Sequence, residues 1–151
     1  MQWKNQRGFT LMELVVVLAI LAVMGAIVLP QFAQRLTEER FVSAVYQVHS
    51  DLRLAQEAAK REQCSVKVNF YPLDKTQIAY IIYFMDMEHT LIKKVELPPG
   101  IKIDYTQDTF VDFGEDGHVD HNGHIVFKQE KMKRSIYFYQ TGRVRISAGK
   151  I

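Results

Sequence analysis

Cysteine, proline and glycine are scarce in this chain. Its 151 residues include one cysteine, four prolines and eight glycines. A single cysteine cannot form an internal disulfide, so a disulfide-stapled fold is excluded and the core must stabilise the domain. Together with 48% hydrophobic residues, the low proline and glycine content excludes a disordered, collagen-like or low-complexity chain. We expect one folded domain, with Cys64 as a small core residue.

An excess of charge of one sign is also missing. Lysine and arginine number 19 against 17 acidic residues, for a net charge of +2, so any contact with nucleic acid must come from a local patch. The chain has no G-x-x-x-x-G-K-[ST] loop for nucleotides and no G-x-S-x-G elbow for acyl transfer, and Cys64 has no obvious histidine partner. We therefore expect a protein that is not an enzyme and needs no cofactor.

One long segment is nearly free of charge. Residues 9–32 are 24 consecutive positions with a single charged side chain, Glu13. A helix of this length reaches about 36 Å, which exceeds the roughly 30 Å hydrocarbon core of a bilayer. Lys4 and Arg7 precede the segment, and basic residues stay on the cytoplasmic side. The sequence predicts a single transmembrane helix over 9–32, with the N-terminus in the cytoplasm and the C-terminal domain outside the cell membrane.

Two ordinary explanations of this segment fit less well. A secretory signal peptide has an apolar run of roughly 7 to 15 residues followed by a small-x-small cleavage site. The run here is longer, and residues 22–26 match that site poorly. A simple signal anchor leaves Glu13 unexplained, because an acid inside the bilayer costs a few kcal/mol unless it has a partner.

The segment from Gly8 to Leu14 reads Gly-Phe-Thr-Leu-Met-Glu-Leu, between a short basic leader and the apolar run. It resembles the processing motif of type IV pilins and pseudopilins. The resemblance implies that a prepilin peptidase removes residues 1–8 by cutting between Gly8 and Phe9, and that the new amino group of Phe9 is N-methylated. It also implies that Glu13 pairs with this amino group, in its own chain or in a neighbouring subunit, during assembly.

The helix is expected to continue beyond the apolar run. Pro30 matches a proline of the pilin helix and should bend or locally open it, although a plain kink at the membrane exit explains it too. In residues 33–63, apolar side chains recur in steps of three and four on one helical face. They are Phe41, Val45, Val48, Leu52, Ala55 and Ala59. We expect an amphipathic continuation of the helix that packs this face on a sheet, with His49 at its boundary.

Residues 64–151 change to the pattern of short strands. Runs rich in valine, isoleucine, phenylalanine and tyrosine, separated by turn residues, occur at 65–71, 77–85, 91–97, 101–105, 110–113, 124–129, 135–139 and 143–146. No helical pattern alternates with them, so a parallel sheet is excluded. The sequence predicts an α+β fold of the type IV pilin kind, in which a long N-terminal helix packs on a meandering antiparallel extracytoplasmic sheet.

Residues beyond the N-terminal motif are similar to one subgroup of minor pilins. They are the segment 51–56 with Ala58 and Ala59, Phe113 before Gly117, the segment 123–125 and the closing segment 142–144. The subgroup contains the secretion pseudopilin GspH, the pilus protein FimT and the competence pseudopilin ComGD. Because Gln56 stands where the GspH and FimT proteins usually carry arginine, and because the chain ends soon after the last strand, the resemblance favours the ComGD proteins.

This resemblance implies a minor pseudopilin that assembles into, or primes, a competence pilus for DNA uptake. Its partners would be other major and minor pilins, the prepilin peptidase, a membrane platform protein, an assembly ATPase and membrane lipid. Two alternatives stay open, namely a GspH-like subunit of a type II secretion system and a DNA-binding subunit at a pilus tip.

Two clusters could carry binding chemistry. Arg143 and Arg145 alternate on one side of the last strand and resemble a DNA-contacting motif of FimT-like pilins, and a solvated strand face is the alternative. The loop 112–124 holds three histidines at three-residue spacing and four acids. That spacing does not bring three imidazoles to one face, and the acids do not fit a calcium loop. We expect a solvated loop without metal.

Overall fold

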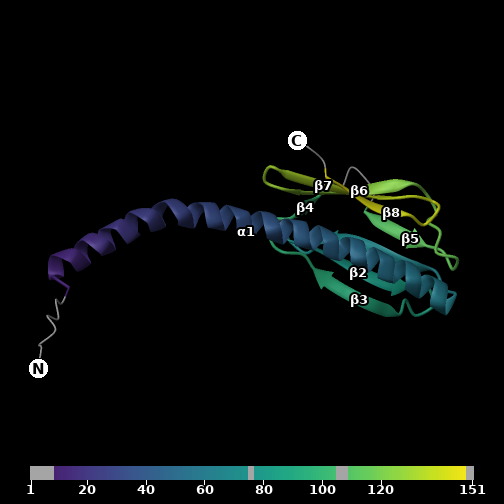
Figure 1. Cartoon of the computed structure of the whole chain (residues 1–151). Helices are drawn as coiled ribbons and strands as arrows, with labels where there is room; N and C mark the ends of the chain where they lie inside the picture. The colour runs from purple at the N-terminus through teal and green to yellow at the C-terminus, as the bar shows by residue number, and fades with distance from the viewer. Residues whose placement is uncertain (1–8, 75–76, 105–108, 149–151) are drawn as a thin grey trace, which may run out of the picture. The chain divides into compact units, whose positions relative to one another are not determined.

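The computed structural model describes residues 9–74, 77–104 and 109–148, without the side chains at 27–31, 33 and 148 (Figure 1). The leader, 1–8, with Lys4, Arg7 and Gly8, lies outside the described residues. The chain divides into two compact units, residues 1–37 and 38–151.

Helix α1 (Leu11–Glu62) belongs to both units. Its residues up to 37 lie in the first unit, and the rest of the helix is the first element of the second unit. Thr10 caps its start, since its Oγ1 accepts a hydrogen bond from the Glu13 N–H at 3.2 Å. At the other end Gln63 adopts the left-handed conformation, with φ of 49°. The Cys64 N–H then donates to the Ala59 carbonyl at 3.3 Å, which closes the last turn.

The first half of α1 exposes apolar side chains. Helical backbone continues unbroken through position 30, while the Pro30 side chain lies outside the description. Of the helix that the structure describes, no stretch is both long and apolar enough to span a membrane. The membrane-spanning role of residues 9–32 stays a prediction, as does the bend at Pro30.

Among its described residues, the second unit has eight strands, which form two four-stranded antiparallel sheets. Sheet A has the order β3 (Leu91–Glu96), β2 (Ile78–Phe84), β1 (Val66–Pro72), β5 (Phe110–Phe113). Sheet B has the order β4 (Lys102–Ile103), β6 (Gly123–Gln129), β7 (Met132–Phe138), β8 (Val144–Ala148). The α+β fold and the eight strands are thus confirmed.

The expected single meander is wrong. Strand β4 leaves its predecessor β3 and pairs with β6 in the other sheet, and β5 pairs with β1. The residues between β3 and β4 include Pro98 and Pro99, which have no backbone N–H to donate to a ladder. A hairpin from β3 to β4 is therefore broken at this point, and the chain passes to the second sheet.

The apolar stripe of α1 is the centre of the core. All six residues predicted for the stripe are buried, from Phe41 to Ala59. They belong to one cluster with inward-facing residues of both sheets, such as Phe70 of β1 and Phe127 of β6, whose rings meet edge-on at 6.0 Å. Figure 1 shows this part of α1 running beside β2 and β3. The interpretation of the stripe as core, and not as a coiled-coil seam, is confirmed.

Cys64 does not lie in the core, contrary to expectation. It is half-buried in the turn between α1 and β1, where its Sγ lies 3.7 Å from the Ser65 carbonyl. The reason is positional, since the helix ends two residues earlier and the apolar stripe stops at Ala59.

A β-bulge turns two consecutive residues of β3 toward α1. Ile82 pairs with Lys93 but the next residue, Tyr83, pairs with Leu91, so Ile92 is the extra residue. A bulge interrupts the alternation of side chains along a strand. As a result Ile92 lines a cavity against α1, and Lys93 also reaches α1, where it binds Asp51.

Asp51 joins the helix to two strands through a buried polar cluster. Its side chain is 7% exposed. Its Oδ2 accepts a hydrogen bond from the Tyr80 hydroxyl at 2.6 Å, and Lys93 Nζ lies 2.7 Å from Oδ1 and 2.8 Å from Oδ2. Burial and the neighbouring Asp51 carboxylate raise the pKa of Tyr80, so its hydroxyl stays a donor. The cluster fixes where α1 sits on sheet A.

Replacing Asp51 by alanine should lower the free energy of unfolding by about 2–3 kcal/mol, because Tyr80 then keeps a buried hydroxyl without an acceptor and Lys93 loses its counter-ion. The control is Lys94→Ala, whose exposed pair with Glu96 at 4.0 Å should contribute less than about 0.5 kcal/mol. Urea unfolding of the full chain in detergent, followed by circular dichroism, measures both. Equal losses in the two variants would contradict a structural role for the cluster.

Candidate functional site

The start of α1 carries the residues of the processing motif. Phe9 is exposed, and Glu13 stands at the third helical position, where a negative charge is favourable beside the helix N-terminus. Thr10 and Glu13 have the spacing of a capping box, and the bond to the Thr10 hydroxyl is one half of it. Over the described residues the Glu13 carboxylate has no ion-pair partner. Its pairing with the Phe9 amino group stays a prediction, because Gly8 lies outside the description.

An apolar surface surrounds this motif on the same helix. Leu11 and Met12 are largely exposed, and apolar side chains as far as Met24 are about half exposed or more. Contiguous exposed apolar surface of this kind marks a region that contacts lipid or other protein. The acid of the motif therefore belongs to a surface that needs an apolar partner.

In the second unit, Gln56 joins α1 to two distant loops. Its amide Nε2 donates to the Gly117 carbonyl at 2.7 Å and to the Gly142 carbonyl at 2.8 Å. These carbonyls lie 61 and 86 residues further along the chain. One amide has two N–H donors, so Gln56 satisfies both acceptors. The structure thus brings together three positions that the sequence had only indicated separately.

Positions 117 and 142, whose carbonyls bind Gln56, both require glycine. The reasons are the backbone conformation and the lack of room for a side chain. Gly117 has φ of 76° and Gly142 has φ of 75°, in the left-handed region that favours glycine. A Cβ at Gly142 would overlap the Gly117 carbonyl oxygen and the Gln56 amide, and one at Gly117 would overlap the Lys60 side chain. The two loops can therefore pack this closely against α1 only because neither glycine has a side chain.

The three histidines of the loop 112–124 lie in different surroundings. The His118 N–H donates to Asp116 Oδ1 at 2.9 Å, and this hydrogen bond lowers the pKa of the Asp116 carboxyl. His121 packs edge-on against the rings of Phe110 and Phe138. His124 instead stacks on Tyr137, with ring centroids 5.1 Å apart. Within the described ranges no three histidine, cysteine or acidic side chains are grouped to hold a metal ion.

The outer face of sheet B is basic. Arg143 and Arg145 are exposed and Val144 between them is buried, so the two arginines share one side. Arg145 lies in one cross-strand row with Tyr137 and His124. Further along the sheet, Lys133 pairs with Lys128, and Lys128 with Lys102. Lys128 is partly neutralised by Asp104, whose Oδ2 lies 2.7 Å from the Lys128 Nζ.

Comparison with known proteins agrees with these features. The family of the prokaryotic N-terminal methylation motif matches residues 3–29. Two fimbrial proteins of Pseudomonas aeruginosa are 37% identical over 71 residues, covering 47% of this chain and 46% of their own lengths. The chain thus spans about half the length of the curated relatives it matches.

Solved structures show the same fold. The type IV minor pilin FimU of Pseudomonas aeruginosa, strain PAO1, superimposes with a TM-score of 0.59 at 13% identity, over 73% of this chain and 90% of FimU. A second crystal form gives 0.55 at 14% identity, over 70% and 90%. The chain therefore has the fold of the type IV minor pilin FimU.

Gly142→Ala should destabilise the chain by about 2–3 kcal/mol, because the new Cβ meets backbone in a left-handed turn. Gly100→Ala is a matched control, since its φ of 88° carries a similar penalty while its nearest neighbour, 3.1 Å away, is the movable end of the Gln129 side chain. We expect about 1 kcal/mol there. Thermal unfolding of both full-length variants tests this, and equal losses would refute the close packing at the junction.

Proposed function

We propose that the chain is a minor pseudopilin of a competence type IV pilus, which assembles into or primes a filament needed for DNA uptake. The observation that carries this proposal is an acid, Glu13, in the first turn of a helix whose other exposed side chains there are apolar. The methylation motif and the minor-pilin fold support it. The competence assignment rests on the resemblance of residues such as Gln56 to the ComGD proteins.

In this proposal a prepilin peptidase cuts between Gly8 and Phe9, and Phe9 is then N-methylated. Residues 9–32 hold the subunit in the cell membrane, with its N-terminus on the cytoplasmic side, until the platform protein and the assembly ATPase extract it. Residues 33–63 continue the helix and residues 64–151 form the extracytoplasmic domain, which reaches the cell surface after assembly.

Glu13 would set the axial position at which each subunit packs against its neighbour in the filament. An isolated carboxylate in an apolar environment is costly, and pairing with the Phe9 amino group of a neighbouring subunit removes that cost. Insertion of the next subunit is thus favoured at the axial position that brings the two charges together. Pro30 would assist by letting the helix bend or open as subunits pack.

Glu13→Val should leave processing and membrane insertion intact but reduce incorporation into filaments at least tenfold. The substitution removes the charge that would dock the subunit, and with it the cost of an unpaired carboxylate that favours assembly. The matched control is Met12→Val, one residue away and without a change in charge, which should be incorporated normally. Immunoblots of sheared filaments and of membranes measure the two pools, and transformation frequency measures uptake. Normal incorporation of the valine variant would refute the docking role.

A second candidate function rests on the basic face of sheet B. We propose that Arg143 and Arg145 contact phosphates of DNA, which would make the subunit a DNA-binding part of a pilus tip. Their shared exposed side and the row with Tyr137 and His124 support this. A GspH-like role in type II secretion needs no DNA contact, and a gene neighbourhood with a secretin and secretion genes would favour it.

The double variant Arg143→Ala/Arg145→Ala should weaken DNA binding and reduce the slope of log K against log salt by about 1.8, because two phosphate contacts are lost. Lys94→Ala on sheet A is the control and should leave the slope unchanged. Gel shift or anisotropy with a short duplex at several salt concentrations measures it. An unchanged slope in the arginine variant would exclude this candidate.

A further inference from the structure

Strand β8 is the end strand of sheet B, so one of its edges has no neighbouring strand among the described residues. At such an edge every second backbone N–H and C=O lacks a partner from the sheet. The segment 142–145, which carries both arginines of the basic face, lies at the start of this strand. Whatever holds its backbone therefore also decides where the two arginine side chains point.

Two carbonyls of the segment 142–145 point away from the sheet. The Arg143 carbonyl faces β7, where it accepts a hydrogen bond from the Tyr139 N–H at 3.0 Å. Carbonyls alternate between the two edges of an extended chain, so those of Gly142 and Val144, on either side of Arg143, point to the opposite edge. Side chains of α1 meet both of them there.

Gln56 and His49 are the two helix residues that do so. Gln56 Nε2 donates to the Gly142 carbonyl at 2.8 Å. His49 Nε2 lies 3.3 Å from the Val144 carbonyl oxygen, to which the tautomer protonated at Nε2 donates. The two residues are about two helical turns apart, so they lie on one flank of α1, and both are half-buried. The helix thus takes the place of a neighbouring strand at this edge.

The segment 142–145 is held from two further directions. The Gly142 N–H donates to the Tyr139 carbonyl at 2.8 Å, and Val144 pairs with Phe138 of β7. The Val144 side chain is buried in the core. Both arginines leave on the remaining, exposed side, from Cα atoms about 6.8 Å apart in an extended chain. A backbone fixed in this way loses little conformational entropy when its side chains bind a ligand.

We propose that Gln56 and His49 are positioning residues, which hold the segment 142–145 so that Arg143 and Arg145 contact two phosphates of one DNA molecule together. The inference rests on the proposed DNA contact of the two arginines and names the residues on which its geometry depends. Neither positioning residue touches DNA itself. Without their hydrogen bonds the segment is tied through β7 and the core alone, and the two arginines no longer keep one spacing.

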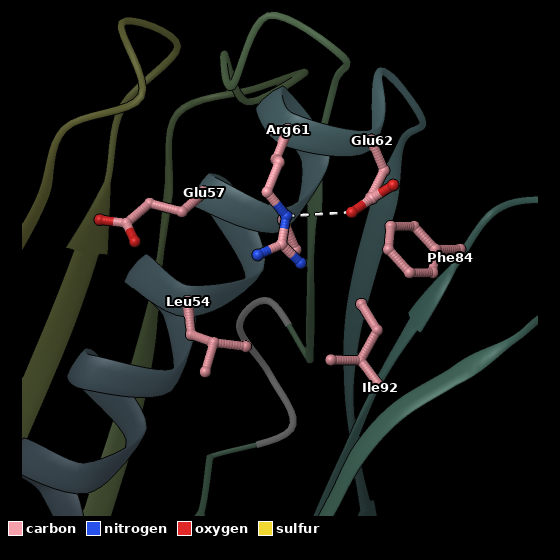
Figure 2. A pocket seen from close by; sticks show the side chains of 7 residues that line it. Leu54, Glu57, Arg61, Glu62, Phe84 and Ile92 are labelled. Atoms are coloured by element: carbon pink, nitrogen blue, oxygen red, sulfur yellow. Dashed lines mark hydrogen bonds and ion pairs between the residues drawn. The ribbon is translucent and has the colours of Figure 1, made fainter.

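The other flank of α1 provides a control region on the same helix. A cavity of 480 Å³ lies there between α1 and sheet A, lined by Leu54 and Arg61 from the helix and by Phe84 and Ile92 from the strands. Figure 2 shows Leu54 and Ile92 on opposite sides of its opening. Because this flank faces sheet A, substitutions on it leave the segment 142–145 in place.

Duplex binding by the full chain in detergent, followed by anisotropy at several salt concentrations, tests the inference. Gln56→Met and His49→Phe keep the approximate size of each side chain and remove its N–H donors. The double variant should bind about fivefold more weakly or worse, with a slope of log K against log salt smaller by about 0.9, because one of two phosphate contacts is lost. His49→Gln keeps an N–H donor and should bind within about twofold of the wild-type chain.

Two matched variants separate positioning from general stability. Asp51→Ala removes the polar contacts of α1 with sheet A and lowers the free energy of unfolding, while Leu54→Met places a methionine on the cavity flank. Both should bind DNA within about twofold of the wild-type chain. Circular dichroism establishes that each variant is folded at the temperature of the assay. If the double variant does not fold, Gln56→Met alone takes its place, with an expected loss of about twofold or more.

A loss as large in Asp51→Ala, or in His49→Gln, would overturn the inference, since it would then follow from stability and not from the N–H donors. Wild-type affinity and slope in the chain without these donors would overturn it too. In that case the DNA candidate stands if Arg143→Ala/Arg145→Ala lowers the slope. If the arginine variant binds as the wild-type chain does, the DNA candidate itself fails and the inference falls with it.

Discussion

Burial of one face of the second half of α1 is the constraint on which the rest of this structure depends. The stripe from Phe41 to Ala59 is covered jointly by both sheets, and the core cluster draws on α1, sheet A and sheet B together. The chain leaves sheet A after β3, and the two sheets meet on the helix and also directly, where the rings of Phe70 and Phe127 lie 6.0 Å apart.

Polar contacts on the two flanks of the stripe fix how the helix lies. Asp51 faces sheet A, where Tyr80 and Lys93 meet its carboxylate, and Gln56 faces the two glycine loops. Apolar packing alone tolerates sliding and rotation of a helix, whereas buried polar groups incur a penalty unless their partners are in place. These two residues thus fix the rotation of the helix about its own axis and its position along that axis.

The two halves of α1 have opposite surroundings. The second half buries its apolar stripe within the chain. The first half exposes its apolar side chains together with Glu13, the acid of the processing motif. A surface of that composition is stable only against lipid or against other apolar helices. The filament assembly proposed for this chain would supply such a partner.

Local patterns in the sequence determined the secondary structure. The helix, the positions of the eight strands and the buried stripe followed from periodicity, because burial on one face imposes a period of 3.6 on helices and of two on strands. The spacing of Thr10 and Glu13 is a further local signal, because a capping box marks the start of a helix. The pairing of strands into two sheets, the bulge that turns Lys93 onto Asp51 and the junction of Gln56 with Gly117 and Gly142 were decided only by the tertiary structure. Each depends on groups tens of residues apart, whose contacts leave no periodic trace in the sequence.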